Sequence, residues 1–287
     1  MRRIGRGILA ALAFAFGYFA YVFITLPDVR PLQKTNPATT AFIELRAREA
    51  RARGAEPRRV QRWVKYSRIS ESLKRAVLVT EDSAFWEHDG LDYQQIRESI
   101  EVNWERGEFA RGASTITQQL AKNLYLSPSK NPVRKMRELL IARRLEAELS
   151  KQRILEIYLN VIEWGEGVYG AEAAARTHFG KSAAALGPQE SALLAAAIAN
   201  PRIMNPGSPT ARLRRRQQMV LRRLGWVEPP PVGAEPAAEP VLAPVPGLPP
   251  SATPLELPGE IAPLPPVPPL KPPGPPGTGR EGGPGGP

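Results

Sequence analysis

The chain has 287 residues, with 39 Lys and Arg against 28 Asp and Glu, and a formal net charge of +11. It contains no cysteine and only two histidines, which excludes disulfides, thiolate metal sites, a cysteine nucleophile and a histidine-rich metal site. Such a basic chain suits nucleic acid, anionic lipid or a phosphate-bearing substrate. No zinc-finger, helix-turn-helix or aromatic RNA-binding signature is present, so nucleic acid is not an expected partner.

Residues 1–26 predict a cytoplasmic tip followed by a single-pass transmembrane anchor. Arg2, Arg3 and Arg6 precede an uncharged apolar run at 8–26. As a helix this run spans about 28 Å, close to the roughly 30 Å core of a bilayer. Because the basic residues flank only its N-terminal side, the rest of the chain is expected in the periplasm, outside the inner membrane. A cleaved signal peptide is the alternative, but the run is long and no small-x-small site follows it.

Residues 27–59 form a predicted linker and basic juxtamembrane segment. Prolines mark the linker from Pro27 to Pro37, and arginines dominate the segment from there to Arg59. Two interpretations are open for the basic part. It is either a solvated charged helix with glutamates as ion-pair partners or a segment that touches anionic lipid.

Residues 60–226 predict one mainly α-helical domain. Apolar residues recur at helical spacing in several stretches, such as Ile154, Leu155, Tyr158, Leu159 and Ile162. Pro188 marks a helix start, and the apolar helix after it is expected to be buried and to end at Asn200-Pro201. No run alternates long enough to require a strand.

The tail at 227–287 is rich in proline and glycine. It has too little apolar surface to offset the entropy of ordering, so disorder with polyproline II stretches is expected. The tail is either a spacer or a ligand for an aromatic groove on a partner.

Four short blocks follow one another in a fixed order from Glu81 to Asn160. They read Glu81-Asp82-x-x-Phe85-x-x-His88-x-Gly90; Gly112-x-Ser114-Thr115-Ile116-Thr117-Gln118-Gln119-Leu120-x-Lys122-Asn123; Arg134-Lys135-x-x-Glu138; and Lys151-x-x-Ile154-Leu155-Glu156-x-Tyr158-Leu159-Asn160. The series resembles the monofunctional biosynthetic peptidoglycan glycosyltransferases of glycosyltransferase family 51, which polymerise the membrane-bound disaccharide-peptide lipid II. The resemblance covers about 60–206. It implies a lysozyme-like helical lobe and a smaller lobe beside the membrane.

The resemblance also implies an inverting glycosyl transfer with two carboxylates. The attacking sugar hydroxyl has a very high pKa and needs a base, while the departing polyprenyl pyrophosphate needs cations or donors. Glu81 is the implied base, and Asp82 is implied to orient or hydrogen-bond nearby groups. Two adjacent carboxylates can also hold one of the pair at a raised pKa. A pair of surface acids at a helix C-terminus is the alternative. Glu138 is the implied second acid near the leaving group. A surface ion pair with Arg134, four residues away, is the alternative for Glu138.

The cations assigned to the pyrophosphate are Lys122, Arg134 and Lys135, with Lys130 as a weaker candidate. Some of the polar run after Gly112 must cap the helix that begins there, and Gln118 or Gln119 is expected at the site. The other predicted substrate-binding residues are Asp82, Phe85, Ser114, Thr115 and Asn123.

Two other functions are open. A lysozyme-like cleaving enzyme could share the helical fold, but cleavage of glycan involves no pyrophosphate for the basic cluster to stabilise. A non-catalytic scaffold could act through the proline-rich tail, but intact Glu81 and Glu138 count against it. The expected partners are lipid II, the growing glycan strand, membrane lipids and other cell wall synthesis or division proteins. No cofactor is expected to be required, and a role for Mg or Mn on Asp82 or Glu138 is open.

Overall fold

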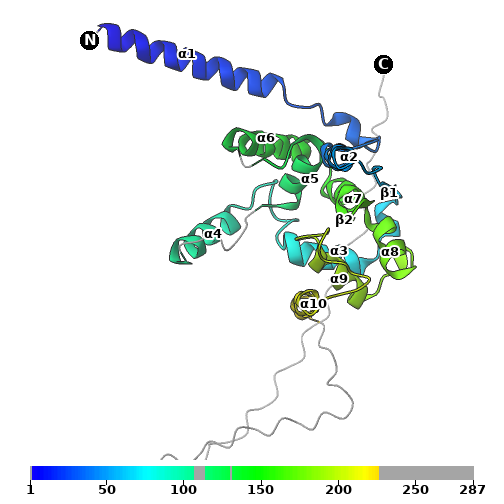
Figure 1. Cartoon of the computed structure of the whole chain (residues 1–287). Coiled ribbons are helices and arrows are strands. Elements are labelled where there is room, and N and C mark those ends of the chain that lie inside the picture. The colour runs from blue at the N-terminus through cyan, green and yellow to red at the C-terminus, as the bar shows by residue number, and fades with distance from the viewer. Residues whose placement is uncertain (1, 107–113, 130, 226–287) are drawn as a thin grey trace, which may run out of the picture. The chain divides into compact units, whose positions relative to one another are not determined.

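The computed structural model describes residues 2–106, 114–129 and 131–225 of the chain (Figure 1). Lys130 and the tail at 227–287, both the subject of predictions, lie outside the described residues. The helices are α1 (Arg2–Ile24), α2 (Ala41–Ala52), α3 (Glu71–Glu81), α4 (Tyr93–Arg106), α5 (Ile116–Tyr125), α6 (Pro132–Glu148), α7 (Lys151–Val161), α8 (Ala171–Phe179), α9 (Pro188–Ala197) and α10 (Ala211–Arg223). The fold is mainly α, as predicted.

Local sequence sets where these helices begin. The hydroxyls of Thr40, Ser70, Thr115, Ser150 and Thr210 each accept a hydrogen bond from the backbone N–H three residues on. A short side-chain acceptor in this place satisfies an N–H that the first helical turn leaves unpaired. Pro132 and Pro188 occupy first positions, where the missing N–H costs nothing. The predicted start of α9 at Pro188 is thus confirmed.

Helix α1 covers most of the predicted anchor. It carries exposed aromatic side chains, among them Phe14, Phe16 and Phe23. Within the described residues, the structure contains no helix whose length and apolar character suffice for a membrane crossing. The anchor at 8–26 stays a prediction from the sequence.

Three short strands form a small sheet that the sequence did not predict. Strand β3 (Val168–Tyr169) pairs in parallel with β1 (Val60–Gln61) and antiparallel with β2 (Glu163–Gly165). Val60 lies opposite Val168, and Glu163 lies opposite Tyr169. Strands of two or three residues are too short for an alternating pattern to be recognised in the sequence, because one face then contributes a single side chain.

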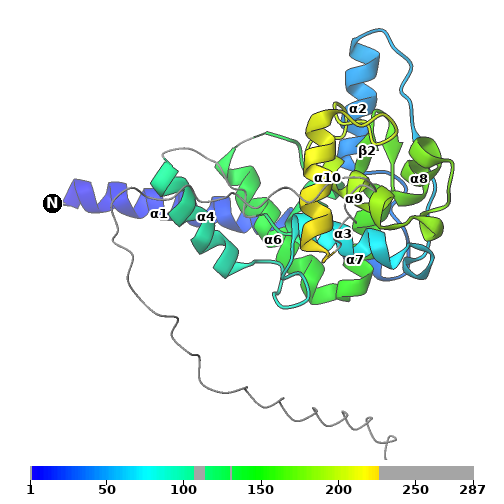
Figure 2. The same ribbon diagram turned by 90° about the horizontal axis from the view of Figure 1, so that it is seen from below.

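The apolar faces meet in one core in which α7 is central. Ile154, Leu155, Tyr158 and Leu159 are fully buried, as the stripe predicted. Helix α5 packs against α6 and α7, while α9 packs against α3 and α10. Figure 2 shows α10 lying along α9 and α3. Some apolar side chains lie outside this core, such as Ile100 of α4, which is 61% exposed.

Polar residues of α7 attach the segment that leads into α3. The Asn160 side chain accepts from the Val64 N–H at 2.9 Å and donates to the Val64 carbonyl at 3.0 Å. Glu156 accepts from the Tyr66 N–H at 2.8 Å. These bonds hold the segment before α3 against α7. They thereby help to set the position of α3 and of its last residue, Glu81.

Candidate active site

Three helices bring the predicted carboxylates and cations together. Glu81 is the last residue of α3, the polar run occupies the start of α5, and Glu138 lies in the second turn of α6. The side chains of α5 connect the two acids, because Gln119 contacts Glu81 and its neighbour Gln118 shares the Lys135 ammonium with Glu138.

Glu81 is held by one specific hydrogen bond. Gln119 Nε2 donates to Glu81 Oε2 at 2.9 Å. Burial raises the pKa of Glu81, and the Gln119 hydrogen bond, Arg216 and Lys122 partly oppose this shift. Glu81 Oε1 accepts no hydrogen bond from the described residues. The result is a carboxylate with a raised pKa and one oxygen that accepts no hydrogen bond from the described residues.

Asp82 organises the site instead of presenting a free carboxylate. Its Oδ2 accepts from the Ile116 N–H at 2.9 Å, and its Oδ1 contacts His88 Nε2 at 2.9 Å. Because Ile116 is the first residue of α5, the negative charge lies at the positive end of a helix dipole. Both oxygens of Asp82 thus contact protein groups, which favours a positioning role, while direct binding of substrate by Asp82 stays a prediction.

Glu138 lies in a cation cluster. It is 3% exposed and contacts Lys135 Nζ through Oε1 at 2.6 Å, while Arg134 donates to its Oε2. Lys135 Nζ also reaches Ser114 Oγ at 3.2 Å and Gln118 Oε1 at 3.1 Å. Lys135 thereby joins the polar run of α5 to α6, and its side chain is still 41% exposed.

Lys122 of α5 lies near enough to both acids for their charges to act on it. Burial lowers the pKa of Lys122, and the charges of Glu138 and Glu81 oppose the shift. Its ammonium also lies 5.8 Å from the ring centroid of Phe42 on α2. No ion pair closer than 4.0 Å engages Lys122 among the described residues, so this cation is available to an anionic ligand.

Three predicted binding residues face the protein interior. Phe85 is fully buried, with Lys151 Nζ 4.6 Å from its ring centroid, and so offers no surface to a substrate. Thr115 is also fully buried and caps α5, as expected for part of the polar run. Asn123 is 9% exposed and donates to the Gln119 carbonyl at 2.8 Å. Their contacts favour a role in supporting the site, and direct binding of substrate by these three residues stays a prediction.

Comparison with known proteins points to the same region. A family model described as Transglycosylase matches residues 49–225. The chain belongs to the transglycosylase family. This confirms the resemblance drawn from the four blocks.

Curated relatives of the family match most of the chain. A biosynthetic peptidoglycan transglycosylase of Dechloromonas aromatica (strain RCB) is 47% identical over 189 residues, which are 66% of this chain and 82% of the relative. One from Aromatoleum aromaticum (strain DSM 19018 / LMG 30748 / EbN1) is 47% identical over 202 residues, 70% and 86% respectively. One from Azoarcus sp. (strain BH72) is 42% identical over 230 residues, 80% and 98% respectively.

Two residues near Glu81 were not among the predicted site residues. Tyr158 belongs to the fourth block and to an apolar stripe, and neither assigned it a role at the site, yet its hydroxyl donates to Gln119 Oε1 at 2.9 Å. Arg216 of α10 bonds the Ala196 carbonyl at 3.2 Å, and its charge lowers the pKa of Glu81. Nothing in the local sequence signals Arg216, because it is one of many arginines in α10.

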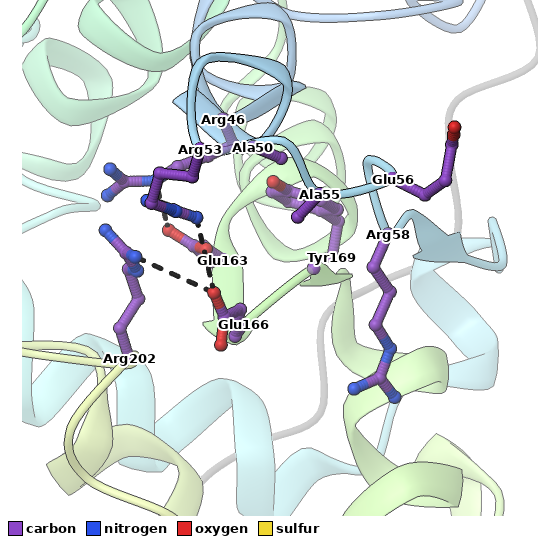
Figure 3. Close-up of a pocket in the computed structure, with 11 residues that line it drawn as sticks. Arg46, Ala50, Arg53, Ala55, Glu56, Arg58, Glu163, Glu166, Tyr169 and Arg202 are labelled. Carbon is purple, nitrogen blue, oxygen red and sulfur yellow. Dashed lines mark hydrogen bonds and ion pairs between the residues drawn. The ribbon is translucent and has the colours of Figure 1, made fainter. Parts of the chain in front are cut away.

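A separate cavity of about 190 Å³ lies between α2 and the β2–β3 hairpin (Figure 3). Arg46 contacts Glu163 at 3.0 Å there, and Arg53 and Arg202 each lie 3.7 Å from Glu166. None of the predicted site residues lines it. The charges of its arginines and glutamates largely neutralise one another. The ion pairs of Arg46 and Arg53 hold α2 against the β2–β3 hairpin.

A metal ion would need a cluster of side chains that could bind it. In the described part of the chain, no three Asp, Glu or His side chains gather where they could hold one. The expectation that no cofactor is required stays a prediction, and a role for Mg or Mn stays open.

Proposed function

We propose that the chain polymerises lipid II into peptidoglycan glycan strands by inverting glycosyl transfer, as part of bacterial cell wall biosynthesis. One observation carries this function. A basic carboxylate with an open oxygen, Glu81, lies across α5 from the cluster of Glu138, Arg134 and Lys135. The family membership and the relatives named biosynthetic peptidoglycan transglycosylase support the same reaction.

In the proposed step, the 4-hydroxyl oxygen of the acceptor sugar attacks the anomeric carbon of the donor. The bond from that carbon to the pyrophosphate oxygen breaks, and the electron pair leaves with the polyprenyl pyrophosphate. The hydroxyl proton passes to Glu81 Oε1, which accepts nothing else from the described residues. Burial raises the pKa of Glu81, which strengthens it as a base.

The leaving pyrophosphate is assigned to the positive groups of α5 and α6. Lys135 is bonded to Glu138 but keeps an exposed side chain, and Lys122 lacks an ion-pair partner among the described residues. Glu138 holds Arg134 and Lys135 in fixed positions, so that they stabilise charge without reorganising as it develops. We therefore propose that Glu138 acts by orienting cations near the leaving group, while Glu81 takes the proton.

Incubation of the purified chain with lipid II tests this function directly. Products sized on a gel should show a ladder that extends to long polymer. Shortening of added wall glycan with no polymer from lipid II would support a cleaving enzyme instead. Absence of both reactions would favour the scaffold interpretation.

We also propose that the domain has the lysozyme-like lobe of its family and works at the periplasmic face of the inner membrane, held there by the N-terminal segment. The uncharged run at 8–26, its flanking arginines and the exposed aromatic residues of α1 support this placement. The reaction is proposed to need no resident cofactor. Membrane lipids and other wall-building proteins remain proposed partners of the flanking segments.

A further inference from the structure

The Glu81 hydrogen bond depends on a group outside the predicted site. Tyr158 of α7 is fully buried, and its hydroxyl donates to Gln119 Oε1 at 2.9 Å. The same Gln119 side chain donates from Nε2 to Glu81 Oε2 at 2.9 Å. The three side chains form a chain of hydrogen bonds from the core helix α7, through α5, to the carboxylate at the end of α3.

We propose that Tyr158 is a positioning residue that fixes the orientation of the Gln119 carboxamide, so that its N–H group always faces Glu81. A carboxamide presents one oxygen, which only accepts, and one NH₂, which only donates. A turned amide would place its oxygen against the Glu81 carboxylate and its NH₂ against Tyr158. The buried phenol proton would then lose Gln119 Oε1, which is its one acceptor among the described residues.

The orientation matters because the two amide faces stabilise different forms of Glu81. The N–H face stabilises the ionised carboxylate, which is the form that accepts a proton. The oxygen face stabilises the protonated acid, which cannot act as a base. Because Tyr158 excludes the arrangement in which the amide oxygen faces Glu81, Glu81 stays ionised, and so active as a base, down to a lower pH. Burial holds the pKa of Tyr158 well above its usual value, so the phenol remains a donor throughout.

Other charges face Glu81 from the elements around it. Lys122 of α5 and Arg216 of α10 lower its pKa, and the adjacent Asp82 raises it. None of these three touches the Tyr158 hydroxyl. Among the described residues, the hydrogen bond that links the Tyr158 hydroxyl to Glu81 therefore runs through Gln119.

A double-mutant cycle on the full chain tests this inference, which rests on the proposed role of Glu81 as base. The rate kcat with lipid II is measured against pH for wild type, Tyr158→Phe, Gln119→Ala and the double variant. Tyr158→Phe should move the acid limb of the profile to higher pH by up to about one unit, because the Gln119 amide is then free to turn and its oxygen stabilises the protonated form of Glu81. Gln119→Ala should shift it likewise, and the double variant should shift no further than Gln119→Ala.

Tyr169→Phe is the matched control. Tyr169 is 1% exposed and lines the separate cavity, so its variant loses a buried hydroxyl without touching Gln119. Its acid limb should stay at the wild-type position, and KM should change little in Tyr158→Phe. An unshifted limb in Tyr158→Phe, or shifts that simply add in the double variant, would overturn the inference. Full activity of Glu81→Gln would instead overturn the proposed base, so the two failures are distinguishable.

Discussion

Replacing Asp82 by alanine should destabilise the fold and the active site together. The Asp82 carboxylate accepts from the Ile116 N–H and contacts His88, and both distances are 2.9 Å. Ile116 is fully buried, so its N–H finds no water in exchange. A hydrogen bond to a charged group contributes about 1.5–3 kcal/mol, so loss of both should lower the free energy of unfolding by about 3–5 kcal/mol.

Urea unfolding followed by circular dichroism measures this change. Asp82→Asn should cost less, about 1–2 kcal/mol, because the amide oxygen can still accept from Ile116. Asp89→Ala is the matched control, since Asp89 is exposed and has no hydrogen-bond partner among the described residues, and it should change stability by no more than about 0.5 kcal/mol. If Asp82→Ala were as stable as Asp89→Ala yet inactive, Asp82 would act on substrate and the positioning role would be wrong.

Two further predictions concern the cation cluster and the backbone. Lys135→Met should lower kcat/KM for lipid II about 100-fold, as loss of a preorganised charge-stabilising group does. Arg143 is exposed, and Arg143→Met should keep a kcat/KM near that of the wild type. Equal kcat/KM values for the two variants would show that Lys135 is not part of the site. Gly170→Ala should cost about 2–4 kcal/mol in a melting experiment, because its φ is 83° and a Cβ would lie 2.6 Å from the Asn160 carbonyl oxygen. Gly54→Ala, with a φ of 71° and open space, should cost only about 1 kcal/mol, and a similar loss in both variants would exclude the clash.

Local signals predicted much of the helical fold. Pro188 opens α9 as predicted, the helix ends at Ala197, shortly before the predicted stop at Asn200-Pro201, and the apolar stripe of α7 is buried in full. These features follow from neighbours within one or two turns, which a sequence displays directly. The strands β1 and β3 pair residues more than a hundred positions apart, and nothing within two-residue strands records that pairing.

The sequence predicted which residues gather at the candidate site but not which of them contact one another there. The four blocks identified Glu81, Glu138 and the amide run between them. They did not separate Gln119, which touches Glu81, from Phe85, which lies in the core. That distinction depends on how α5 rotates against α3 and α7. Tyr158 was not assigned to the site, because an apolar stripe shows where a ring packs and not where its hydroxyl points.

The most direct test of the central claim is the rate of lipid II polymerisation by Glu81→Gln, with product length read on a gel. Glutamine preserves the shape of the side chain but cannot take the proton of the attacking hydroxyl. The rate should fall by a factor on the order of 100 to 10,000, which is the usual contribution of a general base, with an unchanged melting curve. Polymer formed at close to the wild-type rate would contradict the assignment of Glu81 as the base of this reaction.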